Sequence, residues 1–345
     1  MTKPIGIFYE HPEWFKPLFA TLDRRGLPYQ PIRADQHRYD PSARSAPFSL
    51  MFNRVSASSF LRGHGQAILY ARQYLDHLDT LGVPFFNGPR AFDLDLSKAK
   101  QLTLMTKLGL PHPKSRVVNS VDEMAPAADE LAYPIIVKPN LGGSGALMRR
   151  FDSPAELRAA VADGTAAPIL GVDQTAIVQE FHPARGGSIV RVEALDDQYL
   201  YAIRIHNGAS QNFNLCPADI CQTPGVEAPV AEAPAPAEGA ASDDFEFCPA
   251  DAPVLRQLQI EATTPPSWVV DGVLAIFRAA SVDVGGVEYL ESERDGQMYL
   301  YDVNTLSNFV TDAPNLVGFD PFERLVDVLE RRAGLATPAG AIRAS

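Results

Sequence analysis

Short apolar runs alternate with stretches of helical spacing along the first quarter of the chain. Residues 5–8 form an apolar run that predicts a strand, and apolar side chains at helical intervals predict a helix over residues 12–25. The alternation continues with strands at 49–53 and 83–87 and a helix at 66–81. Because alternating strands and helices favour an open parallel sheet, residues 1–90 are predicted to form a Rossmann-like α/β domain.

A second stretch, residues 91–182, combines segments of helical spacing with strand-like apolar runs around one buried strand. Ser120 and Glu123 stand three residues apart, which is the pattern of a capping box at the start of a helix. The stretch is predicted to contain helices at 97–108, 120–131 and 155–162 and strands at 115–118, 134–139 and 176–181.

The last stretch, residues 183–333, is dominated by paired strands. Apolar runs separated by short polar turns predict hairpins over 188–206 and 284–304, and helical spacing predicts helices over 268–280 and 321–332. The chain as a whole is therefore predicted to have an α/β fold with α+β parts.

Two segments depart from these patterns. Residues 216–253 are rich in Ala, Pro and Glu, a composition that buries little apolar surface, so they are predicted to be a disordered insertion. Residues 334–345 are small and polar and are expected to form a tail.

Composition narrows the expected partners and location. A net charge of −12 over 345 residues disfavours a broad nucleic-acid-binding face, although a few local cations suffice to bind a nucleotide. No stretch approaches the roughly 20 apolar residues of a membrane-spanning helix, and Glu10 interrupts the first apolar run, which reads as a strand and not a signal peptide. Cys216, Cys221 and Cys248 make no disulfide framework. We therefore expect a cytoplasmic protein without nucleic-acid or membrane partners.

Three oxygen-bearing side chains stand close together in the last predicted hairpin. Asp302 and Asn304 are two residues apart and share one strand face, and the turn brings Glu288 back opposite them. Two carboxylates and an amide oxygen suit Mg²⁺, which is commonly bound by a few carboxylates together with phosphate oxygens and water. The alternative is a solvated face of an ordinary hairpin, with Tyr301 among the residues expected on the opposite face.

A lysine and a glycine loop follow the buried strand at 134–139. Burying Lys138 is costly unless its charge meets an anion. The loop after it exposes backbone N–H groups without large side chains, and its residues are Gly142, Gly143, Ser144 and Gly145. The pattern is not a Walker loop. It predicts a phosphate site, with a plain flexible turn as the alternative.

Two further features are weak by themselves. Lys98 lies on a predicted helix and, taken alone, reads as a solvated charge. Gln179, Glu180 and Phe181 close an apolar strand and either offer hydrogen bonds to an adenine edge or simply end an edge strand.

Along the chain, Lys98, the buried lysine with its glycine loop, the residues 179–181 and the oxygen-bearing set of the last hairpin follow one another. Together and in this order, these four features resemble the ATP-grasp superfamily, and within it the carboxylate–amine ligases such as D-alanine–D-alanine ligases and ribosomal-protein glutamate ligases. The resemblance covers roughly residues 91–332. Residues 4–90 resemble the small pre-ATP-grasp domain that usually precedes such a unit. The sequences Gly286-Val287-Glu288 and Asp302-Val303-Asn304 correspond to the two metal-binding strands of the family.

The resemblance implies a role for each feature. It implies that Lys98, Lys138 and the loop 142–145 contact the phosphates of ATP, and that the hinge 179–181 holds adenine. The metal set would bind two Mg²⁺ ions, for which Mn²⁺ would substitute. Arg191 and Arg204 match positions where the family places catalytic cations near the phosphates and the reacting carboxylate.

The sequence departs from the family pattern in three places. Glu288 and Asp302 exchange the family's usual Asp and Glu, keeping charge but changing reach. The family's ribose-binding acid after the hinge has no counterpart at Gly187-Ser188-Ile189. The common Ser-Pro-Gly after the metal-binding Asn is replaced by Thr305-Leu306-Ser307-Asn308, a loop on the substrate side, so the family's known substrates are not carried over.

The resemblance implies an ATP-dependent ligase that joins a carboxylate to an amine through an acyl phosphate, releasing ADP and phosphate. Its substrates would be small molecules or peptides, and a homodimer is left open. The alternatives are another ATP-grasp reaction, either carboxylation or phosphoryl transfer, and a non-catalytic ATP-binding protein.

Overall fold

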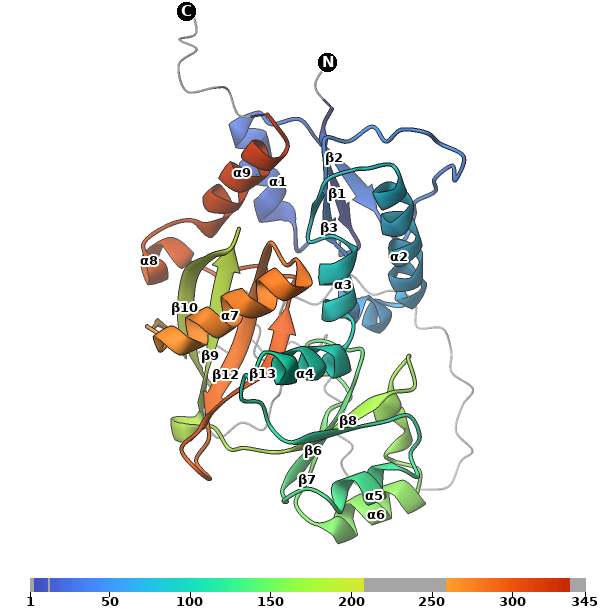
Figure 1. The fold of residues 1–345 in the computed structure, drawn as a ribbon, viewed down its shortest axis with the longest axis vertical. Helices are drawn as coiled ribbons and strands as arrows, with labels where there is room; N and C mark the ends of the chain where they lie inside the picture. Colours follow the sequence, from blue (N-terminus) through green and yellow to red (C-terminus); the bar gives the residue numbers. More distant parts are fainter. Residues whose placement is uncertain (1–2, 12, 208–258, 336–345) are drawn as a thin grey trace, which may run out of the picture.

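The computed structural model describes residues 3–11, 13–207 and 259–335. The segment 216–253, for which a disordered insertion is predicted, and nearly all of the tail 334–345 lie outside the described residues, as do the three cysteines. Three sheets organise the described chain (Figure 1).

An open parallel sheet stands at the start of the chain, as the sequence predicts, with strand order β2-β1-β3-β4. Its strands are β1 (Ile5–Tyr9), β2 (Tyr29–Arg33), β3 (Leu50–Arg54) and β4 (Phe85–Phe86). Its helices are α1 (Lys16–Arg25), α2 (Gly65–Thr80) and α3 (Pro89–Asp95), with a 3₁₀ helix η1 (Ala57–Arg62). The sequence does not predict β2, because Pro31 and polar neighbours interrupt its apolar pattern.

The second sheet is antiparallel, in the order β5-β8-β6-β7. Its strands are β5 (Ser115–Val118), β6 (Ile135–Pro139), β7 (Arg149–Phe151) and β8 (Ala176–Glu180). The helices of this part are α4 (Lys98–Lys107), α5 (Met124–Ala128) and α6 (Pro154–Ala162). Apolar side chains of α5 and α6 pack on the sheet in one buried cluster.

The capping box predicted at Ser120 is wrong. Helix α5 begins at Met124, and no side chain caps it. Pro126 explains the difference, because it has no N–H to donate to the carbonyl of Asp122 and therefore tolerates only the first turn of a helix. The side-chain cap lies instead at α6, where the Ser153 hydroxyl accepts a hydrogen bond from the Glu156 N–H.

The third sheet is antiparallel, with five strands in the order β11-β10-β9-β12-β13. The strands are β9 (Ser188–Leu195), β10 (Gln198–His206), β11 (Gln259–Ala262), β12 (Val284–Glu291) and β13 (Met298–Asn304). Both predicted hairpins are present. Helix α7 (Ser267–Ala280) covers one face in a buried apolar cluster, and the short helix α8 (Ala313–Val317) follows the last strand.

The last helix, α9 (Pro321–Arg332), packs against α1 from the start of the chain (Figure 1). Leu325 and Leu329 of α9 share one buried cluster with Leu18 and Leu22 of α1. At the edge of this contact, Arg25 pairs at 2.7–3.0 Å with Glu323, Asp327 and Glu330. Exposed ion pairs contribute little, so the apolar contact is what fixes α9 on the first unit.

A single asparagine joins the first unit to the third sheet. Asn87 has a positive φ of 50° just after β4. Its side-chain amide donates to the carbonyls of Val284 and Thr305, and its side-chain oxygen accepts from the N–H groups of Asp283 and Val284, all at 2.7–3.1 Å. These bonds fix the start of β12 and the end of β13, the two strands that carry the predicted metal set.

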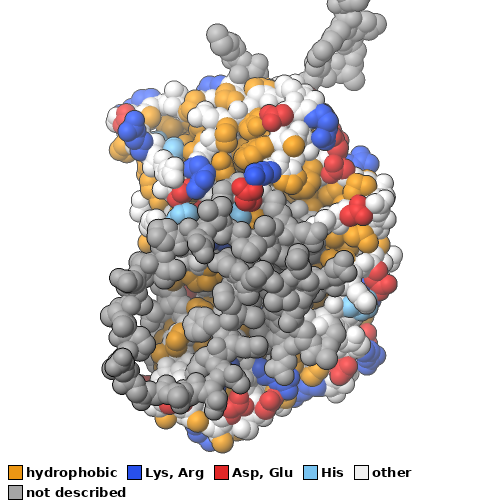
Figure 2. All heavy atoms as spheres, turned by 180° about the vertical axis from the view of Figure 1, so that it is seen from behind, with side chains coloured by type: hydrophobic (Ala, Val, Ile, Leu, Met, Phe, Trp, Pro, Cys, Tyr) orange, Lys and Arg blue, Asp and Glu red, His pale blue; other side chains and the backbone are white. Residues whose placement is uncertain are grey.

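None of the helices within the described ranges is long and apolar enough to cross a membrane. On the face shown in Figure 2, acidic and basic side chains of the described residues lie close to one another in the upper and lower parts of the molecule.

Candidate active site

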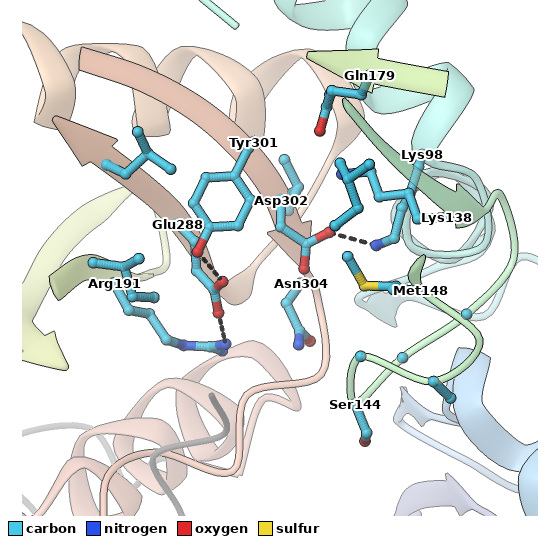
Figure 3. Close-up of a pocket in the computed structure, with 18 of the residues that line it drawn as sticks. Lys98, Lys138, Ser144, Met148, Gln179, Arg191, Glu288, Tyr301, Asp302 and Asn304 are labelled. Atoms are coloured by element: carbon cyan, nitrogen blue, oxygen red, sulfur yellow. Dashed lines mark hydrogen bonds and ion pairs between the residues drawn. The ribbon is translucent and has the colours of Figure 1, made fainter. Parts of the chain in front are cut away.

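A cavity of about 580 Å³ lies where the three units meet, lined by strands of the second and third sheets and by η1. Figure 3 shows side chains from both sides converging on it. Of the residues predicted to form the site, all but Arg204 line this cavity.

Lys138 lies on β6 and is only 3% exposed. No described residue accepts a hydrogen bond from its amine. Burial, reinforced by the nearby charge of Lys98, lowers the pKa of Lys138 to about 8. A buried amine in this state gains most from an anion that enters the cavity.

The glycine loop joins β6 to β7 and follows the cavity wall. Ser144 and Gly145 have positive φ values of 56° and 70°. A Cβ on Gly143 would lie 3.0 Å from the Cβ of Ser58 in η1, so the loop is pressed against the first unit and has little room there for a side chain. The loop therefore presents mainly backbone to the cavity.

Lys98 begins α4 and reaches across to the third sheet. Its amine donates to Asp302 Oδ1 at 2.5 Å. Burial lowers the pKa of Lys98, but the carboxylates of Asp302, Asp95 and Glu288 together raise it above its usual value. The reading of Lys98 as a solvated charge, which the residue alone suggests, is therefore wrong, since this lysine side chain is only 14% exposed.

The pairing of β12 with β13 brings together the predicted metal set, Glu288, Asp302 and Asn304. Glu288 lies directly opposite Asp302, and Gly286 opposite Asn304. The register shifts between Glu288 and Tyr289, which leaves Tyr301 as the extra residue of a β-bulge.

The bulge corrects one expectation. Tyr301 faces the cavity together with Asp302, although simple alternation places it on the opposite face. Its hydroxyl donates to Glu288 Oε2 at 2.9 Å, and burial raises the tyrosine pKa well above its usual value, so the hydroxyl keeps its proton.

Arg191 lies on β9 with only 4% of its surface exposed. Its Nε donates to Glu193 Oε1 at 2.6 Å and its Nη1 to Glu288 Oε1 at 3.2 Å. A Cβ on Gly286 would come within 2.7 Å of the Arg191 Nε, so the guanidinium rests directly on the bare backbone of β12. Burial and the charge of Asp302 raise the Glu288 pKa against the opposing effect of Arg191.

Arg204 does not join the site, which corrects its assignment as a catalytic cation. A bulge between Tyr199 and Tyr201 shifts the register of β10, so that Arg204 pairs with Val190 and not with a neighbour on the Arg191 face. Val190 packs in the cluster under α7. Arg204 therefore lies on that outer face, where it bonds to Ser188 and lies 3.7 Å from Glu261.

The hinge 179–181 forms the far end of the cavity. The Gln179 amide donates to the Ser115 hydroxyl at 2.8 Å, and Glu180 Oε1 accepts from the Ala132 N–H at 2.9 Å. Phe181 stacks under the guanidinium of Arg150, 4.7 Å from its ring centre. These side chains already have partners, and the N–H groups of Glu180 and Phe181 donate to the carbonyls of Lys114 and Pro134.

Several cavity residues escape the sequence reasoning. Arg150 lies on β7, a short strand that apolar periodicity does not reveal, and Asp95 is a half-buried acid whose carboxylate accepts the Thr305 N–H at 2.8 Å. Trp14 and Ser58 come from the first unit, and only the tertiary fold brings them here.

Among the described residues no group of three or more His, Cys, Asp or Glu side chains is placed to hold a metal. The candidate set is two carboxylates and one amide. This donor set fits Mg²⁺ when phosphate oxygens and water complete the shell, and it does not fit a site made of protein ligands alone.

Known proteins share this architecture. Residues 97–206 match the family model of the carbamoyl-phosphate synthase L chain, ATP-binding domain. D-alanine–D-alanine ligase of Pseudomonas putida (strain GB-1) is 36% identical over 87 residues, which make up 25% of this chain and 27% of that protein. The chain therefore matches only about a quarter of the length of this relative.

Two solved structures superpose over nearly the whole chain. The ATP-grasp ligase PsnB, complexed with minimal precursor, Mg and ADP, has a TM-score of 0.62 and 17% identity, over 96% of this chain and 99% of its own. The D-alanine–D-alanine ligase from Bacillus anthracis complexed with ATP has a TM-score of 0.62 and 15% identity, over 96% and 97%. The chain has the ATP-grasp fold, and the fold predicted from the sequence is confirmed.

Proposed function

We propose that the protein is an ATP-dependent ligase that joins a carboxylate to an amine through an acyl phosphate. The observation that carries the proposal is the division of one cavity between opposite charges. Lys138 and the glycine loop line one side, while Glu288, Asp302 and Asn304 face them from the other. A polyphosphate with its divalent ions fits between these two sides.

Each group then has a defined task. The hinge 179–181 holds adenine, and Lys98, Lys138 and the loop 142–145 hold the phosphates. When bound, Mg²⁺ held by the metal set neutralises charge on the transferred phosphoryl group. We propose two ions there, with Mn²⁺ as a working substitute.

The reaction needs no nucleophilic side chain. A substrate carboxylate oxygen forms a bond to the γ-phosphorus, and the bond from that phosphorus to the β-phosphate oxygen breaks, releasing ADP. The amine nitrogen then attacks the acyl carbon, phosphate leaves, and the amine proton passes to solvent. Arg191 offers a fixed positive charge to the acyl phosphate and to the developing oxyanion.

The substrates are proposed to be small molecules or peptides. PsnB was solved with a precursor, and the D-alanine–D-alanine ligases are named for a small amino acid. Trp14, Ser58 and Asn308 also line the cavity, and together they offer an apolar ring and polar groups to such a substrate. A cytoplasmic location and a homodimer stay predictions.

The test begins with a screen for ADP release in mixtures of amino acids and short peptides, and the products of positive mixtures are identified by mass spectrometry. The decisive experiment then follows ¹⁸O from a labelled carboxylate substrate. An acyl phosphate transfers one ¹⁸O from the carboxylate to inorganic phosphate and leaves an amide. Lys138→Met is the matched inactive control, since it removes the charge and keeps the length.

Other outcomes identify the rivals. A phosphorylated product without an amide would show a phosphoryl transfer, and bicarbonate-dependent ADP release with a new carboxyl group would show a carboxylation. ATP binding without turnover in any mixture would show a non-catalytic protein.

A further inference from the structure

Lys98 is fixed at its backbone and reaches across the cavity with its side chain. The Lys98 N–H donates to the carbonyl of Asn140 at 3.2 Å, and the Ala99 N–H donates to the Asn140 side-chain oxygen at 2.9 Å. Asn140 directly follows β6, the strand of Lys138, so the base of Lys98 belongs to the side of the cavity that Lys138 and the glycine loop line. The Lys98 amine nevertheless donates to Asp302 on the other side (Figure 3).

The helix that carries Lys98 is also held beside the metal set. The Gln101 side-chain amide donates to the carbonyl of Val303 at 2.8 Å, and the Gln101 side-chain oxygen accepts the Val303 N–H at 3.1 Å. Val303 stands between Asp302 and Asn304 on β13, so these two bonds give α4 a fixed place. A change in the position of the Lys98 charge must therefore come from its flexible four-carbon stem.

The Lys98 amine stands among acids that attract a cation. Against the effect of burial, the carboxylates of Asp302, Asp95 and Glu288 together raise the lysine pKa. The ammonium neutralises Asp302, and it would repel a divalent ion that approached the same carboxylate. Glu288 is neutralised in the same way by Arg191, whose Nη1 lies 3.2 Å from Glu288 Oε1. Each acid of the metal set thus already has a cation of the protein beside it.

We propose that the Lys98 amine takes the place of a metal ion at Asp302 in the nucleotide-free protein and moves to a phosphate when a nucleotide enters. The inference rests on the proposed binding of ATP in this cavity and concerns the order of binding. The phosphates draw the ammonium away, which uncovers Asp302 when phosphate oxygens are present to complete the shell of the ion. The metal set is therefore closed to free divalent ions and opens with the nucleotide.

The test measures two affinities without any ligation substrate. Binding of Mn²⁺ alone is followed by the EPR signal of the free ion, and binding of metal-free ATP by calorimetry. In Lys98→Met, Mn²⁺ should bind at least roughly tenfold more tightly than in the wild-type protein, because the like charge beside Asp302 is gone. Metal-free ATP should bind roughly tenfold more weakly, because a charged phosphate partner is lost. A substitution that only disturbs the fold would weaken both.

Three further variants make the result specific. Lys98→Arg keeps the positive charge and should stay closed to Mn²⁺. Lys100→Met removes an exposed lysine of the same helix, which lies 3.4 Å from Asp93, and should leave both affinities unchanged. Adding Asp302→Asn to Lys98→Met should abolish the gained Mn²⁺ binding, because the ion would lose a carboxylate of the metal set.

The inference fails, with ATP binding still standing, if the wild-type protein binds Mn²⁺ as tightly as Lys98→Met does. It also fails if the gained Mn²⁺ binding survives Asp302→Asn, or if Lys98→Met binds metal-free ATP as tightly as the wild-type protein. A wild-type protein that binds no nucleotide would instead overturn the proposed function, whatever the Mn²⁺ titrations show.

Discussion

Raising the pH should weaken ATP binding through Lys138. The pKa of this buried amine is lowered to about 8 by burial and by the charge of Lys98. Only the protonated amine attracts a phosphate, so the free protein loses a binding group as the pH rises through this value. Lys98 stays charged over the same range, because Asp302 raises its pKa despite its burial.

The size of the effect follows from the protonated fraction. With a pKa near 8, about three quarters of Lys138 is charged at about pH 7.5 and about a tenth at about pH 9, so the affinity should fall roughly eightfold. The terminal phosphate, with a second pKa of about 6, is fully ionised throughout and does not contribute to the slope. Calorimetric titration of magnesium-free ATP at constant ionic strength measures this change.

Two variants isolate the residue. Lys138→Met should bind ATP weakly and with no slope above about pH 7.5. Lys100→Met removes a lysine from the same helix as Lys98, with 55% of its side chain exposed, and should keep the wild-type slope. The reasoning fails if wild-type affinity is flat up to about pH 9, or if Lys138→Met retains the slope.

Three further changes test the site and its support. Gly286→Ala places a Cβ 2.7 Å from the Arg191 Nε, so Arg191 should lose its buried hydrogen bond to Glu288. That bond contributes about 1.5–3 kcal/mol, and its loss should lower kcat/KM for ADP release by about 10- to 100-fold. An unchanged kcat/KM would show that Arg191 has room to move. Asn87→Ala removes four side-chain hydrogen bonds and should destabilise the fold by about 2–4 kcal/mol, seen as a lower Tm, and an unaltered melt would contradict the role of Asn87 as a joint. The double change Glu288→Asp with Asp302→Glu should retain more turnover than either single change, whereas additive losses would mean that the two acids do not share an ion.

Local patterns in the sequence predict much of the site. Spacing by two along a strand predicts that Asp302 and Asn304 share a face, and the short turn predicts Glu288 opposite them, which the register of β12 and β13 bears out. A buried lysine before a glycine loop points to the phosphate side. These features are local in sequence, so periodicity is sufficient to find them.

Two of the errors at the site have one common cause, the single extra residue of a β-bulge. One bulge in β13 turns Tyr301 toward the cavity, and another in β10 turns Arg204 away from it. A shift of one residue exchanges the two faces of a strand. The alternation of polar and apolar residues in these two strands does not indicate where such a shift occurs. The contact between Gly143 and Ser58 escapes prediction for a different reason, since it joins units far apart in the sequence.

The pairing of α1 with α9 bears on how the protein is made. Helix α1 leaves the ribosome about 300 residues before α9. At synthesis rates of roughly 5–20 residues per second, the apolar side of α1 therefore stays exposed for tens of seconds before α9 can pack on it. During that interval Leu18 and Leu22 lack the apolar neighbours Leu325 and Leu329. Completion of the N-terminal unit is thus delayed until the chain is nearly finished, and a ribosome stalled before α9 would hold a nascent chain open to chaperones and proteases.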